Sequence, residues 1–149
     1  MHEIGHNIWL LHSNGKDRPS YGDQLCMIGL FSTELDSLYK CFNAAKSQQL
    51  SWYNDKLAVL DIESISEERI RLAAILYYSE IDNYSLVKIV NYANGFVYYV
   101  AFHTNYRITY ELDRHNSLDI IKQSLSLLYE DSLLATRLFD NDNGFEMNR

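Results

Sequence analysis

The sequence is poor in several features that mark particular classes of protein. It holds two cysteines and one proline among 149 residues, and 20 Asp and Glu residues outnumber 13 Lys and Arg residues, for a net charge of −7. Because nucleic acid requires a basic binding surface, this balance argues against nucleic acid as a partner. No apolar run reaches the roughly 18 residues of a membrane-spanning helix, and no signal peptide is visible. We therefore expect a globular chain without a nucleic-acid or membrane partner.

Sequence motifs that mark several other protein classes are also missing. The sequence contains no Gly-x-Ser-x-Gly motif, so a hydrolase built on that serine turn has no support. Two cysteines at this spacing do not make a zinc site by themselves. There is no internal repeat and no low-complexity tract, and 149 residues suffice for one domain or two small ones. The hydrophobic content of 47% is ordinary for a protein with a packed core.

Histidines are concentrated at the start of the chain. His2, His6 and His12 fall within the first twelve residues, and Glu3 follows the first of them. An α-helix turns about 100° per residue, so His2 and His6 lie about 40° apart on one face, where two imidazoles can bind one metal ion. His12 would lie on the wrong side of a continuing helix, so the chain must leave the helix and fold back. The spacing predicts a Zn²⁺ site with these three histidines as ligands.

The residue types in this cluster also indicate a reaction. Three neutral imidazoles leave a fourth zinc position open for water, and zinc lowers the pKa of such a water to roughly 7. Glu3 is placed to take the proton of that water as general base and to pass it to the leaving amine. The pattern predicts zinc-dependent hydrolysis of peptide bonds. The other two histidines, His103 and His115, lack ligand spacing, and we interpret them as strand or loop residues.

Three stretches of the sequence resemble the gametolysin-type peptidases, a group of the metzincin zinc metallopeptidases. They are His2–Ser13 (HEIGHNIWLLHS), Tyr21–Gly29 (YGDQLCMIG) and Cys41–Tyr53 (CFNAAKSQQLSWY). The resemblance extends in order and spacing over about the first 53 residues. It implies a zinc helix with the three histidine ligands and the general base Glu3.

The same resemblance implies a fold and a setting. We expect an α+β chain in which residues 1–53 are the C-terminal part of a metzincin-like catalytic domain, comprising the zinc helix and the lower subdomain. Residues 54–149 would form an antiparallel, β-sandwich-like domain. The family acts outside the cell on protein or glycoprotein substrates of the extracellular matrix or cell wall. Because its catalytic domains carry a sheet before the zinc helix, we expect this chain to be a fragment. The alternative is a non-catalytic remnant whose β domain is a binding or structural module.

Two residues depart from the family pattern. Trp9 stands where the family has a glycine that ends the zinc helix in a left-handed conformation. Either Trp9 carries the strain of that conformation, or Asn7 makes the turn, or His12 lies out of reach. In the Met-turn, which packs beneath the zinc, Ile28 aligns with the family methionine and Met27 comes one position early.

Cys26 and Cys41 both lie in the family-like stretches. They bracket residues 30–40, whose apolar spacing predicts a short helix. A disulfide that closes this loop is the preferred interpretation and fits an oxidising, extracellular setting. The alternative is a pair of buried thiols.

The second half of the sequence has the residue pattern of a β protein. Runs rich in β-branched and aromatic residues recur with polar breaks, and Asn94-Gly95 is a hairpin signal between two of them. The segment 117–138 fits either a helical stripe or two strands with a turn near Ser126, and we expect strands. The predicted strand runs are Lys56–Asp61, Ile70–Ser79, Ser85–Asn91, Phe96–Thr104 and Arg107–Glu111.

Overall fold

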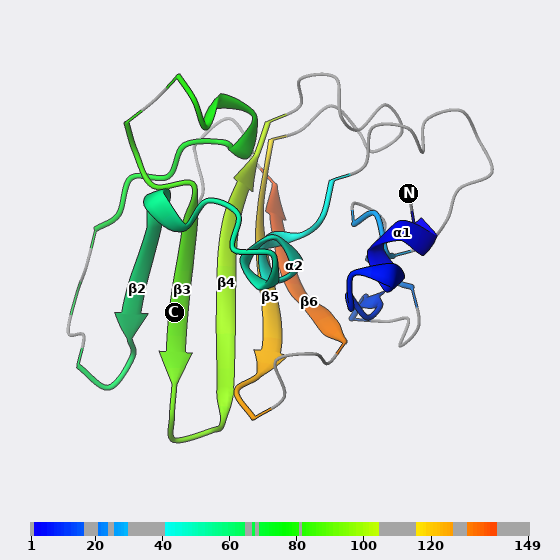
Figure 1. The fold of residues 1–149 in the computed structure, drawn as a ribbon. Coiled ribbons are helices and arrows are strands. Elements are labelled where there is room, and N and C mark those ends of the chain that lie inside the picture. The colour runs from blue at the N-terminus through cyan, green and yellow to red at the C-terminus, as the bar shows by residue number, and fades with distance from the viewer. Residues whose placement is uncertain are drawn as a thin grey trace.

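A computed structural model describes residues 2–16, 21–23, 26–29, 41–64, 67, 69–80, 82–104, 116–126 and 131–139. These residues form a mixed α and β fold built on one six-stranded sheet with few helices (Figure 1). The elements are α1 (His2–Asn7), β1 (Ser13–Asn14), α2 (Ala44–Gln49), β2 (Leu57–Asp61), β3 (Leu86–Asn91), β4 (Phe96–His103), β5 (Ser117–Ser124) and β6 (Ser132–Phe139), with 3₁₀ turns η2 (Asn54–Lys56) and η3 (Ile75–Tyr77). The expected α+β class is confirmed at this level. No helix within these ranges combines the length and the apolar character that crossing a membrane requires.

The sheet has the strand order β1-β6-β5-β4-β3-β2. Strands β3 to β6 are antiparallel neighbours, whereas β2 joins β3 and β1 joins β6 in parallel. The prediction of an antiparallel β-sandwich is therefore wrong for the described residues, which form a single mixed sheet. One cause is the run Ile70–Ser79, which contributes a single bridge at Leu72 and then turns into η3 instead of forming a strand. A short apolar run does not reveal its conformation by periodicity alone.

Most other strand predictions are confirmed. Strands β2, β3 and β4 match three of the predicted runs, and the segment 117–138 contains the two strands β5 and β6 with a bend at Ser126. Gly95 has a φ of 72° in the turn between β3 and β4, as the hairpin signal requires. The predicted helix at 30–40 and the predicted strand Arg107–Glu111 lie outside the described residues.

The larger core lies between α2 and the sheet. Ala44 and Ala45 pack against Leu86, Tyr99 and Ile121, and in Figure 1 the helix crosses in front of β4 and β5. Small alanine side chains let the helix approach the sheet closely. Burial raises the pKa of the Tyr99 hydroxyl to about 12. This core orders α2, and with it the residue that caps its N-terminus, Asn43.

A second, smaller core holds the beginning of the chain. Leu10, Cys26, Ile28 and Phe42 are buried together, beside α1. Strand β1 then joins this region to β6 at the edge of the sheet. Residues from both sides of the predicted domain boundary between 53 and 54 thus contribute to one sheet. The boundary itself stays a prediction.

The cysteines do not form the preferred disulfide. Cys26 and Cys41 are paired positions of an isolated bridge, yet both thiols are free. Cys26 is fully buried and its sulfur accepts a hydrogen bond of 3.3 Å from the Asn43 backbone N–H, while Cys41 is exposed. Burial, and then the charge of Asp23, raise the pKa of the Cys26 thiol to about 12. The physical reason is that the two side chains lie in different environments, one in the small core and one at the surface.

Candidate metal centre

The turn that ends α1 brings the chain back toward the helix. Trp9 N–H donates to the His6 carbonyl and Leu10 N–H donates to the Gly5 carbonyl, and Trp9 has a φ of 64°. This is a Schellman motif with a tryptophan at the position that glycine normally takes. Of the three possibilities raised by the sequence, Trp9 therefore carries the strain, at a cost of about 1–2 kcal/mol. Its side chain is 77% exposed, so little burial compensates for that cost.

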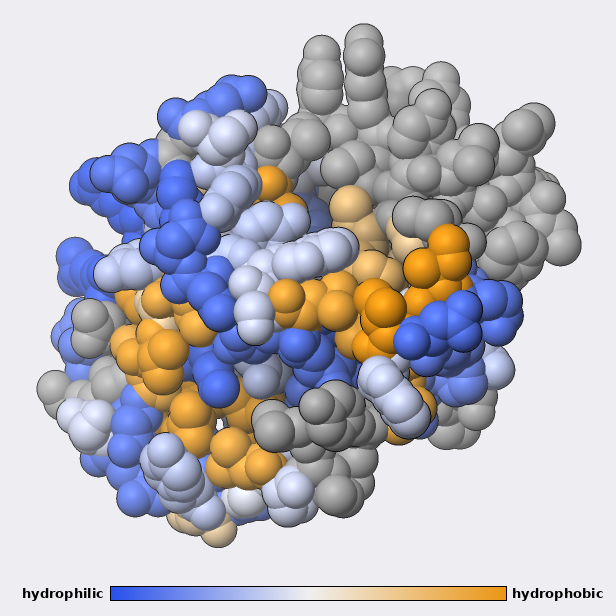
Figure 2. Space-filling model, viewed as in Figure 1, coloured by the Kyte–Doolittle hydropathy of each residue, from blue (hydrophilic) through white to orange (hydrophobic). Residues whose placement is uncertain are grey.

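Close packing on the small core holds α1 in place. A Cβ atom added to Gly5 would lie 2.7 Å from Ile28 Cγ2, so the helix backbone rests directly on Ile28. Leu10, two per cent exposed, packs in the same core. Ile28, the residue that aligns with the family methionine, therefore packs against α1. Figure 2 shows apolar side chains at the surface over α1, where Ile4 and Ile8 are 54% and 43% exposed, so the helix is held by its other face.

The three histidines predicted as ligands come together. One ring nitrogen of each lies within 4.8 Å of the others, and the ring centroids are 4.7 to 5.8 Å apart. His2 Nε2 and His6 Nε2 are separated by 3.2 Å. Zn–N bonds of about 2.0–2.1 Å in a tetrahedral site place two ligand nitrogens about 3.3–3.4 Å apart. The spacing of the His2 and His6 donor atoms thus fits a zinc ion, and the His12 nitrogen lies within 4.8 Å of both.

The hydrogen bonds of the first two rings support this fit. His2 Nδ1 lies 3.1 Å from the Met27 carbonyl oxygen, and His6 Nδ1 lies 2.8 Å from the Leu10 carbonyl oxygen. Because a carbonyl only accepts, each Nδ1 must carry the hydrogen, and each neutral ring then points an Nε2 lone pair at the other. Two facing lone pairs at 3.2 Å repel unless a cation or a shared proton lies between them. Backbone carbonyls that fix the tautomer in this way are typical of histidine ligands to metals.

His12 completes the group from the extended segment after the turn. Burial, and then the neighbouring His6, lower the pKa of its imidazole, which favours the neutral form that binds metals. Tyr21 packs against this ring with centroids 4.2 Å apart, and its ring centroid is 5.9 Å from that of His2. Tyr21 was not among the residues that the sequence predicted for the site. The one feature of the sequence that pointed to Tyr21 is that it begins the second family-like stretch.

The remaining predicted residues have different positions. Glu3 lies on α1, next to His2, and its side chain is exposed. Met27 contributes its backbone carbonyl to the site and packs only partly against the small core. His103 lies on β4, 3.8 Å from Asp119, in accord with its interpretation as a strand residue. His115 is outside the described residues.

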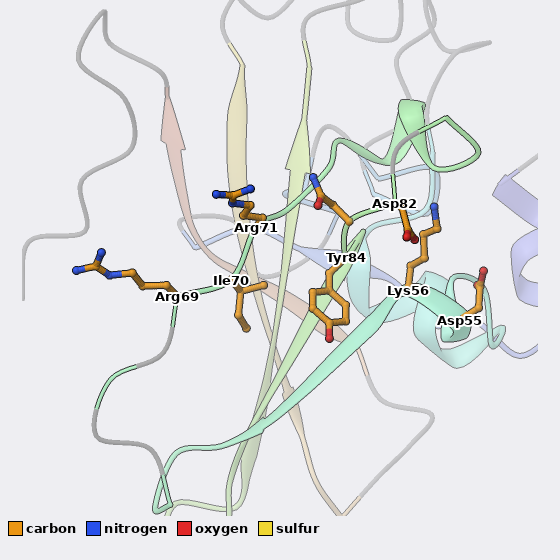
Figure 3. A pocket seen from close by; sticks show the side chains of 8 residues that line it. Asp55, Lys56, Arg69, Ile70, Arg71, Asp82 and Tyr84 are labelled. Carbon is orange, nitrogen blue, oxygen red and sulfur yellow. The ribbon is translucent and has the colours of Figure 1, made fainter.

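A concave region lies at the opposite edge of the sheet from β1, beside β2. It is a hollow of about 350 Å³ lined by charged and polar side chains, among them Lys56, Arg71, Asp82 and Tyr84 (Figure 3). Lys56 Nζ already donates to the Tyr78 carbonyl at 2.7 Å. The Arg69 side chain extends away from the others and is 93% exposed. The polar groups that line this hollow do not converge on one point, so the histidine cluster is the stronger candidate site.

Comparison with known proteins adds no relative. No protein-family model, no curated protein and no solved structure matches the chain. The case for the site therefore depends on its own residues and geometry.

Proposed function

We propose that this chain carries the zinc centre of a metalloendopeptidase of the gametolysin type. His2, His6 and His12 are the zinc ligands and Glu3 is the general base. One observation carries the proposal: the Nε2 atoms of His2 and His6 face each other at 3.2 Å while both Nδ1 atoms lie against backbone carbonyls. A cation between the rings removes the repulsion that this arrangement otherwise imposes.

The chemistry divides between the metal and the chain. Zinc, when bound, acts as the Lewis acid that makes water nucleophilic near neutral pH and polarises the peptide carbonyl. The carbonyls of Met27 and Leu10 hold two imidazoles in the ligating tautomer. The Glu3 carboxylate accepts the proton of the attacking water and returns it to the amine nitrogen as the peptide bond breaks. Its exposure at the helix surface leaves it accessible to water and to a substrate.

The substrate class follows from the resemblance alone. It indicates protein or glycoprotein substrates of the extracellular matrix or cell wall, and an extracellular location. An exposed catalytic residue and half-buried ligands are compatible with an extended peptide as substrate.

A second candidate function is a non-catalytic protein whose sheet acts as a structural or binding module. The larger core favours it, because this core consists of residues from α2 and the sheet and includes none from α1. On this alternative the histidine cluster binds zinc weakly or not at all, and the sheet folds regardless.

Zinc stoichiometry and cleavage of an unfolded protein substrate, measured on the full chain, separate the two. We expect one zinc per chain in the wild type and in Glu3→Gln, with cleavage lost only in Glu3→Gln. His6→Ala should lose both zinc and cleavage. His103→Ala is the matched control, because this histidine lies on β4 away from the cluster. Zinc uptake that His6→Ala leaves unchanged would eliminate the proposed centre, and zinc without cleavage would favour the non-catalytic alternative.

A further inference from the structure

His12 is the ligand whose position α1 does not determine. It follows the turn at Trp9 and precedes β1, in a segment that belongs to no helix or strand. On one side the buried Leu10 anchors this segment. On the other side, Ser13 N–H donates to the Ile28 carbonyl at 3.2 Å, and Ser132 N–H donates to the His12 carbonyl at 3.1 Å. The location of His12 thus depends on how Ser13 and Ser132 are held.

A buried group of four polar side chains holds these two serines. Its members are Ser13, Asp23, Asn43 and Ser132, all of them 5% exposed or less. Ser13 Oγ donates to Asp23 Oδ2 at 2.7 Å, and Ser132 Oγ donates to Ser13 Oγ at 3.3 Å. Asp23 N–H in turn donates to the Ser13 carbonyl at 3.2 Å. Four segments that are distant in the sequence meet here.

Asn43 is the centre of this group. Its Nδ2 lies 2.6 Å from Ser13 Oγ, 3.0 Å from Ser132 Oγ and 3.1 Å from Asp23 Oδ2. Its Oδ1 accepts a hydrogen bond of 3.0 Å from the Lys46 N–H, as the N-cap of α2. The orientation of the amide is unambiguous, because only the nitrogen can donate to a carboxylate and only the oxygen can accept from a backbone N–H.

We infer that Asn43 is a positioning residue for the third metal ligand, His12. This inference rests on the proposed zinc centre. The amide donates to the serine that follows His12 in the chain and to the serine whose N–H binds the His12 carbonyl. Asn43 therefore connects α2, which packs on the sheet, to the segment of His12, which has no regular structure of its own. The hydroxyls of both serines bind within the buried group, so Asn43 acts on His12 through the backbone beside it.

The chemistry of the amide makes the inference testable. Asn43→Asp keeps the size of the side chain and its capping oxygen, since aspartate is also a good N-cap. It replaces the donating nitrogen by an oxygen that faces three oxygen atoms, one of them in the buried Asp23 carboxylate. We expect Ser13 and Ser132 to separate from residue 43, and His12 to move with them. Ser132→Ala is a milder variant, which removes one of the three contacts and leaves Asn43 in place.

The test is a double-mutant cycle on zinc affinity, measured by competition with a chelator. Loss of an outer-shell contact weakens metal binding about 10–100-fold, and we expect that range for Asn43→Asp and a smaller loss for Ser132→Ala. In a His12→Ala background, the same two changes should alter the affinity less than twofold, because the ligand they position is gone. An equal loss in both backgrounds, or no loss in either, would overturn the inference.

A measurement without metal keeps the inference separate from the proposed function. NMR signals of the three imidazole rings in the zinc-free chain should shift most for His12 in Asn43→Asp and less for His2 and His6. Asn54→Asp, an exposed amide outside the buried group, is the matched control and should move none of them. A wild-type chain that binds no zinc would reject the zinc centre, and the ring signals alone would then decide whether Asn43 positions His12. Unmoved His12 signals would reject that role.

Discussion

The sheet with α2 and the histidine region at the start of the chain are stabilised in different ways. The sheet region buries a cluster of eight apolar residues, which includes members of α2, β3, β4 and β5. The histidine region buries four apolar residues and depends as much on specific polar contacts: a Schellman turn, two histidine–carbonyl hydrogen bonds and the group around Asn43. Apolar burial is non-directional and sets stability, whereas hydrogen bonds have preferred geometry and set the positions of atoms. We therefore expect substitutions in the sheet region to change stability, and those in the histidine region to change metal binding.

The largest effect should come from the sheet core. Ile121, on β5, is completely buried in the core that α2 forms with the sheet, so Ile121→Ala should lower the free energy of unfolding by about 2–5 kcal/mol. Chemical denaturation of the zinc-free chain measures this loss. Zinc affinity of the folded fraction should remain within a few fold of the wild type. An affinity that falls in proportion to the stability would show that the two regions are not separable in this way.

Lys46, on α2, lies between the two regions and should make stability depend on pH. Burial lowers the pKa of its ammonium group to about 8, from 10.5 for an unperturbed lysine. Between these pH values the unfolded chain binds more protons, so the contribution of Lys46 to stability rises with pH through this window, by on the order of 3 kcal/mol.

Lys46→Met removes this contribution, so it should stabilise the chain most at pH 7 and lose that advantage toward pH 10.5. Denaturation at several pH values, with the wild type beside the variant, measures the difference directly and cancels the titration of Cys26 and Tyr99. A constant difference across the window would contradict the assignment.

Gly5→Ala tests how closely α1 rests on the small core. Alanine favours helices over glycine, but its Cβ would lie 2.7 Å from Ile28 Cγ2. We expect a net cost of about 1–3 kcal/mol from overpacking, together with weaker zinc binding as the helix shifts. Ile28→Ala with Gly5→Ala removes the opposing Cγ2, so it should restore part of the zinc affinity that Gly5→Ala loses. Thermal unfolding and zinc titration of the two variants give the answer.

The smallest effect concerns the turn at Trp9. Glycine adopts a φ of 64° without a Cβ penalty, and the exposed indole contributes little burial. Trp9→Gly should therefore stabilise the chain by about 1 kcal/mol and tighten zinc binding several-fold, because the turn that positions His12 no longer carries strain. Unchanged zinc affinity would show that the strain is absorbed within the turn and does not reach the ligands.

Parts of both regions were predictable from the sequence. The spacing of His2, His6 and His12 predicted a shared site, and these rings do meet, because helical periodicity and a chain reversal are local properties. The strands β2 to β6 were predictable for the same reason, since alternation and turn residues act over a few positions. The run Ile70–Ser79 was misjudged because its conformation depends on contacts with Tyr84, which are not local.

The sequence by itself determined the residue set of the site: three imidazoles at spacings that suit a metal, with the Glu3 carboxylate beside the first, followed by short strands and a tight hairpin. Only the tertiary structure decided which groups surround that set. The carbonyls that orient two rings, the tyrosine that packs on the third and the amide of Asn43 come from segments up to 31 residues away from His12 in the sequence. Local periodicity carries no information about such contacts. They arise when the two cores pack and bring Ser13, Asp23, Asn43 and Ser132 to one buried point.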